Sequence, residues 1–236
     1  MNTDNKILKE NNDVKSSKVP FAVAEAYKSI RTNLLFLLTK KKGNVVIVSG
    51  SDISEGKSTT AVNLAVAFSQ LGDKVLLIDG DLRRSSIHKK TKLENNKGLS
   101  DVLGGFAEFK DAVKSVNPSL DVLTSGHQAP NPSELLGSTR CETLINELKE
   151  QYNYIIVDTP PVNVVSDALI VAPKSDGVIL VVRDKFTMSD ALKKAIEAFE
   201  FANIKVLGAI MNAAGTKGNG KYSKKYKYSY KYSYKY

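Results

Sequence analysis

The sequence predicts a doubly wound α/β domain with a mostly parallel β-sheet. Between Asn44 and Asn212, short apolar runs alternate with segments of helical periodicity. The runs are apolar on both faces, and strands of this kind occur in parallel sheets that helices cover on both sides. The chain has 236 residues, of which 42% are hydrophobic and 25% charged. It can therefore bury the core of one such domain, and disorder of the whole chain is excluded.

The elements are expected in a regular order. Residues 1–19 are polar and aperiodic, which is typical of a flexible leader, and Pro20 opens a helix that runs to residue 38. The apolar runs that predict strands lie at residues 44–50, 74–81, 120–126, 154–161, 177–183 and 205–212. The segments that predict further helices are residues 57–71, 138–150 and 188–202. In this class of fold, the ligand is expected at the carboxyl ends of the strands.

Composition limits the compartment and the contact with membranes. A single cysteine, Cys141, cannot form an intramolecular disulfide, and the N-terminus lacks the apolar run of a secretory signal, so we expect a cytoplasmic protein. The most apolar helical segment is interrupted by Glu25, Lys28 and Arg31, and it cannot span a bilayer. Contact with the membrane would therefore depend on a partner.

The net charge of +9 is concentrated at the C-terminus. Seven lysines lie in the last twenty residues, so the preceding residues carry 9 − 7 = +2. Residues 215–236 are rich in Gly, Lys, Ser and Tyr and contain no aliphatic residue. This composition cannot form a packed core and predicts a disordered tail. The folded domain is accordingly expected over residues 20–214.

A phosphate-binding loop is predicted after the first strand. Residues 45–59 read VVIVSGSDISEGKST, a buried strand followed by a loop and the start of a helix. Backbone N–H groups of such a loop can hold phosphate oxygens, while Lys57 reaches the β- and γ-phosphates and Ser58 reaches Mg²⁺. The strict pattern has Gly where this chain has Ser51. Taken alone, the segment also fits an exposed Gly-Lys-Ser turn that starts a helix.

Two further strands end in aspartates. Asp79 and Asp81 follow one apolar run, and Asp158 follows another. Mg²⁺ bound to a triphosphate needs oxygen ligands or their bound waters, and carboxylates at strand ends beside the phosphate loop meet this need. An aspartate at a strand end often only caps the next helix. The three motifs together nevertheless favour a nucleotide site.

These motifs resemble those of the bacterial tyrosine kinases (BY-kinases) of capsular and exopolysaccharide synthesis. The resemblance covers residues 20–236, and its motifs are Glu25-x-x-Lys28-x-x-Arg31, SDISEGKST at 51–59, LLIDGDLRR at 76–84, NPSELL at 131–136, IIVDTPP at 155–161 and the tyrosine-rich C-terminus. It implies a P-loop NTPase fold of the MinD/ParA-like type. It also implies an ATP-dependent protein-tyrosine kinase that phosphorylates its own C-terminal tyrosines in trans and regulates polysaccharide polymerisation and export. The chain departs from the family at Ile53-Ser54, Lys28 and Ser85, where Pro-Gly, Arg and Pro are common.

The resemblance implies roles for individual residues. Lys57 would stabilise the charge of the transferring phosphate, and Asp79 would take the proton of the incoming tyrosine hydroxyl. The residues implied to serve Mg²⁺ are Ser58, Asp81 and Asp158. The residues implied to bind ATP are Ser54, Glu55, Gly56, Lys57, Ser58, Thr59 and Asn212. Asn212 would contact the base, and it could equally be only a polar strand end.

The resemblance also implies partners. Copies of the chain would form a ring while unphosphorylated, with a contact at Glu25, Lys28 and Arg31, a stripe that otherwise fits a solvated helix face. A transmembrane activator, the polysaccharide co-polymerase subunit, would hold the protein peripherally at the inner face of the cell membrane. A cognate tyrosine phosphatase would reverse the modification.

The C-terminal tail contains the expected phosphorylation sites. They are Tyr222, Tyr226, Tyr228, Tyr230, Tyr232, Tyr234 and Tyr236. Interleaved Lys and Tyr would also suit a single-stranded nucleic-acid binder, but the nucleotide motifs favour a phosphate acceptor, and no nucleic-acid partner is expected. A second alternative is a positioning ATPase of the same fold without kinase activity. Such ATPases usually carry an extra lysine where this chain has Asp52.

Overall fold

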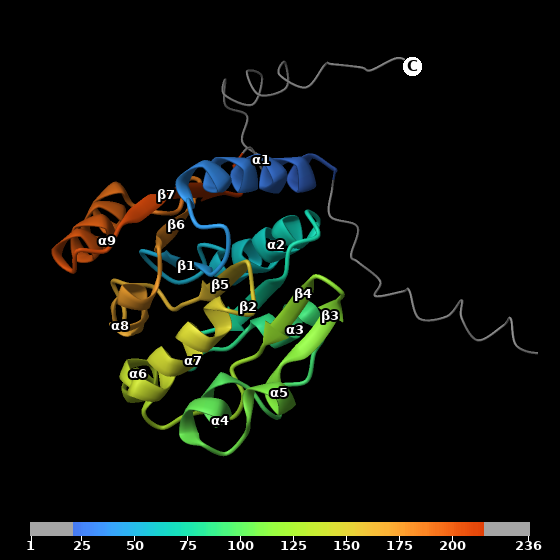
Figure 1. Ribbon diagram of the computed structural model, residues 1–236. Coiled ribbons are helices and arrows are strands. Elements are labelled where there is room, and N and C mark those ends of the chain that lie inside the picture. The colour runs from blue at the N-terminus through green and yellow to red at the C-terminus, as the bar shows by residue number, and fades with distance from the viewer. Residues whose placement is uncertain (1–20, 215–236) are drawn as a thin grey trace, which may run out of the picture.

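A seven-stranded sheet lies at the centre of the structure, a computed structural model that describes residues 21–214 (Figure 1). Its strands follow the order β3-β4-β2-β5-β1-β6-β7, so the first strand lies inside the sheet and the chain winds outward on both sides. The strands are β1 (Asn44–Gly50), β2 (Val75–Asp79), β3 (Lys114–Asn117), β4 (Leu120–Leu123), β5 (Tyr154–Asp158), β6 (Gly177–Arg183) and β7 (Val206–Asn212). The predicted doubly wound fold is confirmed.

The sheet is parallel except at one edge. β1 pairs in parallel with β5 and β6, and all seven of its residues are buried, as expected of a strand covered on both faces. The antiparallel pair is β3 with β4. β3 was not predicted, because its four residues alternate between half-buried and exposed positions and form no apolar run.

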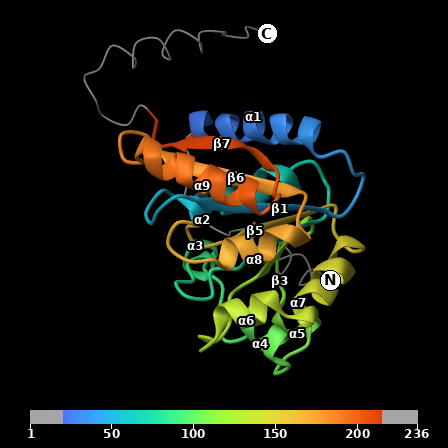
Figure 2. The same ribbon diagram turned by 90° about the vertical axis from the view of Figure 1, so that its left-hand side faces the viewer.

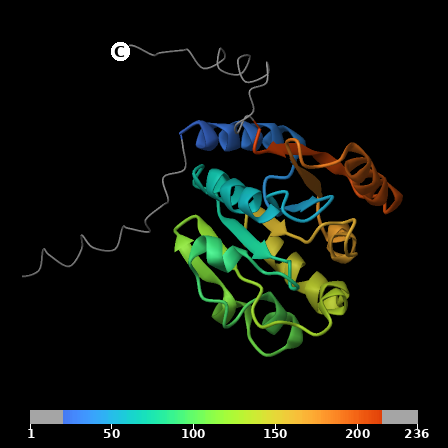
Figure 3. The same ribbon diagram turned by 180° about the vertical axis from the view of Figure 1, so that it is seen from behind.

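Helices cover both faces of the sheet. One face carries α1 (Phe21–Leu37), α2 (Lys57–Ser69) and α3 (Ile87–Thr91), and the other carries α4 (Leu99–Gly104), α5 (Phe109–Ala112), α6 (Pro132–Gly137), α7 (Thr139–Lys149), α8 (Asp167–Val171) and α9 (Ser189–Phe201). Alternate residues of β1 serve the two cores, with Val46 and Val48 on the α2 side and Val45 and Ile47 on the α9 side. Figure 2 shows α8 and α9 in front of the sheet, and Figure 3 shows α1 beside α2 on the other face.

Several elements are shorter than the sequence suggested. The strands predicted to reach residues 81, 126 and 161 end at Asp79, Leu123 and Asp158, because the chain beyond each point turns into a loop. Helices α3, α4, α5, α6 and α8 were not predicted, since four to six residues are too few to show helical periodicity.

The loops after β1, β2 and β5 meet at the carboxyl ends of these parallel strands. β5 lies between β1 and β2, and in their register Asp158 is level with Val48 on one side and with Asp79 on the other. The chain also reverses its winding direction at β1, which is where doubly wound sheets bind ligands. The topology therefore brings the predicted phosphate loop and the aspartate-bearing strand ends together.

Two predicted segments lie outside the described residues. They are the leader at residues 1–19 and the tail at 215–236, which contains the seven clustered tyrosines. Within residues 21–214, no helix combines the length and the apolarity that crossing a membrane would need.

Candidate functional site

The phosphate loop forms the turn between β1 and α2, as the sequence predicts. Lys57 is the first residue of α2, and Gly56 before it has a φ of 97°, in the left-handed region that favours glycine. A side chain at Gly56 would also overlap the side-chain amide of Asn212. No side chain in the described part of the chain caps α2, so the N–H groups of its first turn remain available to phosphate oxygens.

A buried carboxylate braces the loop from inside. Glu55 accepts hydrogen bonds from the Ser51 hydroxyl at 2.5 Å, the Asp52 N–H at 3.0 Å and the Thr187 hydroxyl at 2.8 Å. The side chain of Glu55 is therefore committed to the loop, and only its backbone N–H can serve a phosphate. Ser51, the departure from the strict motif, supplies one of the three donors.

The ends of β6 and β7 hold the loop from outside. Arg183 Nη1 donates to the Ser54 carbonyl at 3.3 Å, and Asn212 Nδ2 donates to the Glu55 carbonyl at 3.0 Å. The structure thus gives Asn212 a contact with the phosphate loop, and its contact with a base stays a prediction. Sequence reasoning missed Arg183 and Thr187, although a cation at the carboxyl end of a predicted strand was a usable signal.

Lys57 is buried among carboxylates. Its Nζ donates to the Asp52 carbonyl at 2.6 Å, which uses one of its three N–H groups. Burial lowers the pKa of Lys57, while the negative charges of Glu55 and Asp158 oppose the shift. The ammonium group retains two donors for an anionic ligand.

Asp158, the last residue of β5, is buried, and neither of its carboxylate oxygens accepts a hydrogen bond from any residue that the structure describes. Burial raises the pKa of Asp158 well above its usual range, and the charges of Asp79 and Asp81 add to this. Ser58 and Lys57 favour the charged form, although no hydrogen bond of good geometry joins Ser58 to the carboxylate. A buried carboxylate without partners is costly and can bind a cation or an ordered water.

Asp79, the last residue of β2, is fully buried, and only one of its two carboxylate oxygens is hydrogen-bonded within the described residues. Its Oδ2 accepts from the N–H groups of Ser86 at 3.2 Å and Ile87 at 3.1 Å, whereas Oδ1 has no hydrogen-bond partner between residues 21 and 214. Burial raises the pKa of Asp79 to about 7, and the charge of Asp81 contributes, while the Ile87 and Ser86 amides oppose the shift. The group is thus poised between its two protonation states near neutral pH.

Asp81 lies at the cavity wall, in front of the other two aspartates. It is half-buried, and its Oδ1 accepts from the N–H groups of Arg83 at 3.2 Å and Arg84 at 2.8 Å. Unlike Asp79 and Asp158, it lines the cavity. The three predicted aspartates are therefore neighbours at different depths.

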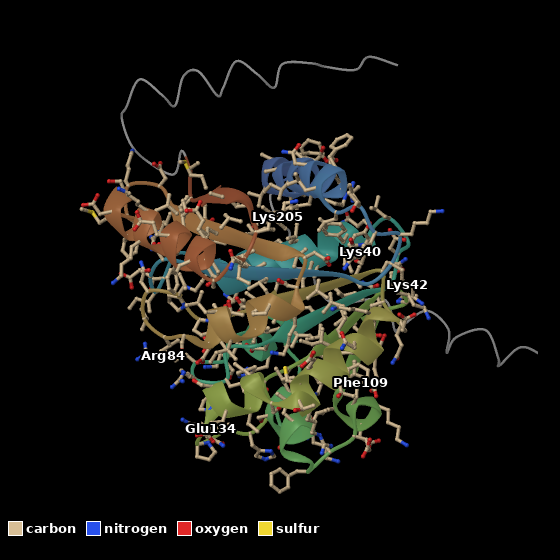
Figure 4. The ribbon with its side chains drawn as sticks, turned by 60° about the vertical axis from the view of Figure 1, so that its left-hand side comes forward. Lys40, Lys42, Arg84, Phe109, Glu134 and Lys205 are labelled. Atoms are coloured by element: carbon tan, nitrogen blue, oxygen red, sulfur yellow. The ribbon has the colours of Figure 1, made fainter. Side chains whose placement is uncertain are left out.

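The cavity has a volume of about 670 Å³ and three walls. The first is the phosphate loop with the start of α2, and the second is the loop after β2, with Arg84, together with Lys90 of α3. The third follows β5 and is apolar, with Pro161 and Val164. Figure 4 shows Arg84 projecting at this edge of the molecule. The site combines phosphate-binding groups and cations with a surface that suits an aromatic ring.

The α1 residues that were predicted to contact another subunit make some of their contacts within their own chain. Glu25 accepts from Lys28 at 2.7 Å, and Arg31 Nη1 donates to the Ala67 carbonyl of α2 at 2.5 Å. Arg31 thus ties α1 to α2 within one subunit. A contact between copies through these residues stays a prediction.

The residues present fit a magnesium–nucleotide complex. The first turn of α2 has no side-chain cap, Lys57 offers free donors, and Asp158 has unpartnered oxygens near Ser58. Within residues 21–214, no three Asp, Glu, His or Cys side chains converge as a ready-made metal site. Mg²⁺ at nucleotide sites usually takes one or two carboxylates with water and phosphate oxygens, so such a cluster is not required.

Known proteins resemble this chain over most of its length. A family model described as an AAA domain matches residues 44–207. The tyrosine-protein kinase YwqD of Bacillus subtilis is 44% identical over 190 residues, which make up 80% of this chain and 80% of that protein. The kinase domain of the Escherichia coli tyrosine kinase ETK matches with a TM-score of 0.80 and 32% identity, over 90% of this chain and 80% of that one.

A more distant structure shows the fold alone. The cell division ATPase MinD of Pyrococcus furiosus matches with a TM-score of 0.63 at 24% identity, over 74% of each chain. The predicted MinD-like P-loop architecture is therefore confirmed, and the higher sequence identities are with tyrosine kinases. The chain belongs to the bacterial tyrosine-protein kinases, as its motifs predicted.

Proposed function

We propose that the cavity binds ATP with Mg²⁺ and that the kinase transfers the γ-phosphate to a tyrosine hydroxyl. The observation that carries this proposal is the pair of buried, incompletely hydrogen-bonded carboxylates, Asp79 and Asp158, directly behind the phosphate loop. Such groups destabilise the free protein and are retained where their charge serves a ligand. When bound, Mg²⁺ would neutralise phosphate charge that develops during the transfer.

The phosphate groups and the metal would be held by different residues. The N–H groups from Gly56 to Thr59 and the Lys57 ammonium hold the phosphates, which fits their position at the start of α2. Ser58 and Asp81 line the cavity and would hold the metal, and Asp158 behind them would serve it through water. Phosphoryl transfer depends mainly on positioning and charge stabilisation, so the loss of Lys57 should cost orders of magnitude in rate.

Asp79 is proposed to accept the proton of the attacking hydroxyl. The hydroxyl oxygen forms a bond to the γ-phosphorus, the bond to the bridging oxygen of ADP breaks, and the proton passes to Oδ1 of Asp79. A pKa of about 7 suits a general base at neutral pH, and Oδ1 is the oxygen without a partner. The acceptor ring would lie against Pro161 and Val164 with its hydroxyl beside Asp81, and the proton would reach Asp79, behind the cavity lining, through water.

The tyrosines from Tyr222 to Tyr236 are the proposed acceptors, outside the described residues. A coil of twenty residues spans about 25 Å on average and at most about 66 Å. This reach is enough for the tail of one subunit to enter the cavity of another. Autophosphorylation in trans is therefore sterically possible within an oligomer.

Phosphorylation would reverse the charge of the tail. Each phosphate adds about −1.5 to −2, so seven would change the tail from its +7 to about −4 to −7. Phosphorylated tails would repel nucleotide phosphates and each other, which favours separation of the subunits. We connect this cycle with a transmembrane activator and a phosphatase, and with the regulation of polysaccharide polymerisation and export at the inner face of the membrane.

The test is incubation of the purified protein with ATP and Mg²⁺, followed by detection of phosphotyrosine and by mass spectrometry. Lys57→Met should abolish phosphotyrosine with the fold intact, whereas Lys89→Met, at an exposed position of α3 outside the cavity, should retain it. Phosphotyrosine in folded Lys57→Met would contradict the site. Modification confined to Tyr27, Tyr152 or Tyr154 would contradict the tail as acceptor.

A further inference from the structure

Three polar side chains form a closed hydrogen-bonded group beside the cavity. Asp167, the first residue of α8, is fully buried and accepts from Arg83 Nε at 2.8 Å and Nη2 at 3.1 Å. Ser133 of α6 accepts from Arg83 Nη2 at 2.8 Å and donates to Asp167 Oδ1 at 2.8 Å. We call Arg83, Ser133 and Asp167 the arginine clamp. Neither Ser133 nor Asp167 has a role in the site described above.

The clamp joins three separate segments of the chain. Arg83 lies in the loop after β2, while Ser133 and Asp167 lie in the first turns of two short helices that pack against each other. Figure 4 shows Arg84 and Glu134, the chain neighbours of Arg83 and Ser133, at the same edge of the molecule. The guanidinium fork makes a bidentate contact, which fixes its orientation as well as its position.

The clamped loop also orients Asp81. The backbone N–H groups of Arg83 and Arg84 donate to Asp81 Oδ1 at 3.2 Å and 2.8 Å. The side chain of Arg83 is therefore anchored to buried Asp167 while its backbone holds the carboxylate that lines the cavity. A loop released from the clamp would no longer hold these two N–H groups in place.

We infer that Ser133 and Asp167 are positioning residues for the kinase reaction, which act through Arg83 to fix the carboxylate of Asp81 toward magnesium and nucleotide. This inference rests on the proposed role of Asp81. The clamp also stabilises the fold, because loss of Arg83 would leave the fully buried Asp167 carboxylate without its ion-pair partner. A purely stabilising role would not change the effect of Mg²⁺ on nucleotide affinity, so this effect separates the two roles. The clamp also gives the NPSELL segment, which contains Ser133, a function that its sequence alone did not reveal.

The experiment compares nucleotide affinity with and without the metal. ADP binding is measured by calorimetry in Mg²⁺ and in EDTA for wild type, Asp167→Asn, Ser133→Ala and Arg83→Lys, the last of which keeps the charge but loses the planar fork. Affinity in EDTA should be unchanged, while the gain in affinity from Mg²⁺ should fall about 10- to 100-fold in Asp167→Asn and Arg83→Lys, as for other groups that orient metal-binding carboxylates. Ser133→Ala should show a smaller fall, because the fork remains. Glu134→Ala, at an exposed position of the same helix, should match wild type.

Kinetics provide a second readout. The clamp variants should lose tyrosine phosphorylation at limiting Mg²⁺ and recover at high Mg²⁺, because the defect lies in placing the carboxylate. Arg83→Lys combined with Asp167→Asn should lose no more than the worse single variant, since both break the same contact. Additive losses would contradict a shared clamp.

The outcomes separate this inference from the proposed function. If Asp81→Asn leaves the effect of Mg²⁺ on ADP affinity unchanged, the assignment of Asp81 is wrong and the clamp loses its target. If Asp81→Asn removes the effect but folded clamp variants retain it, the clamp is only structural and the function stands. Should Asp167→Asn fail to fold, Arg83→Lys and Ser133→Ala still decide the question, because neither change leaves a buried charge without an adjacent polar group.

Discussion

The raised pKa of Asp79 predicts how the free energy of unfolding depends on pH. In the folded protein this pKa is about 7, against an ordinary value of 3.8. The folded state therefore binds the proton more tightly than the unfolded chain, so the contribution of Asp79 is fully present below pH 4 and is lost as pH rises to 7. A pKa difference of one unit corresponds to about 1.4 kcal/mol. The difference of about three units between the folded and unfolded states therefore lowers the free energy of unfolding by about 4 kcal/mol.

Asp79→Asn isolates this effect. The amide oxygen can still accept from Ser86 and Ile87, but the side chain has no charge to bury. The variant should match wild type near pH 4 and exceed its free energy of unfolding by about 4 kcal/mol at pH 8, while losing kinase activity. Urea denaturation without nucleotide or metal measures this, with Asp111→Asn, exposed on α5, as the control. The reasoning would be refuted if the difference in the free energy of unfolding between Asp79→Asn and wild type were the same at pH 4 and at pH 8.

Two further predictions concern the loop and the first helix. Gly56→Ala should destabilise the protein by about 1–2 kcal/mol from the positive φ alone and weaken ADP binding, since its methyl group overlaps Asn212; wild-type melting and affinity would contradict this. Neutralising Glu25, Lys28 and Arg31 together should reduce the mass by light scattering if copies associate through α1. Because exposed pairs contribute about 0 to 1 kcal/mol each, an unchanged oligomer would show that the stripe serves only its own chain.

The sequence predicted the parts of the fold that repeat a strong pattern. β1 and β5 are continuous apolar runs, and their ends place the phosphate loop and Asp158 where the sheet must bring them together. Asp79 and Asp81 were likewise predicted as site residues because they follow the apolar run of β2. The apolar pattern could not show that the strand stops at Asp79, because the next residues are determined by loop hydrogen bonds.

The parts that could not be predicted depend on contacts between distant segments. The Thr187 hydroxyl is 132 residues from Glu55, which it braces, and Asp167 is 84 residues from Arg83. α6 and α8, which carry Ser133 and Asp167 of the arginine clamp, are too short for periodicity to reveal. The role of a buried polar side chain can be assigned only when its hydrogen-bond partner is known. A single sequence does not indicate which distant residues form such pairs.

The three aspartates of the site have one chemistry and three environments. Asp158 is fully buried without hydrogen bonds, Asp79 is buried with one oxygen held by two amides, and Asp81 is half-buried and lines the cavity. Because burial favours the neutral carboxyl, the two deeper groups depend on nearby positive charge to ionise, whereas the outer group meets solvent and ligand. Different roles for identical side chains follow from such differences in environment. The depth of each aspartate is in turn set by its place relative to the end of a buried strand: Asp79 and Asp158 are the last residues of β2 and β5 and lie level in register, whereas Asp81 follows β2 by two residues and reaches the cavity.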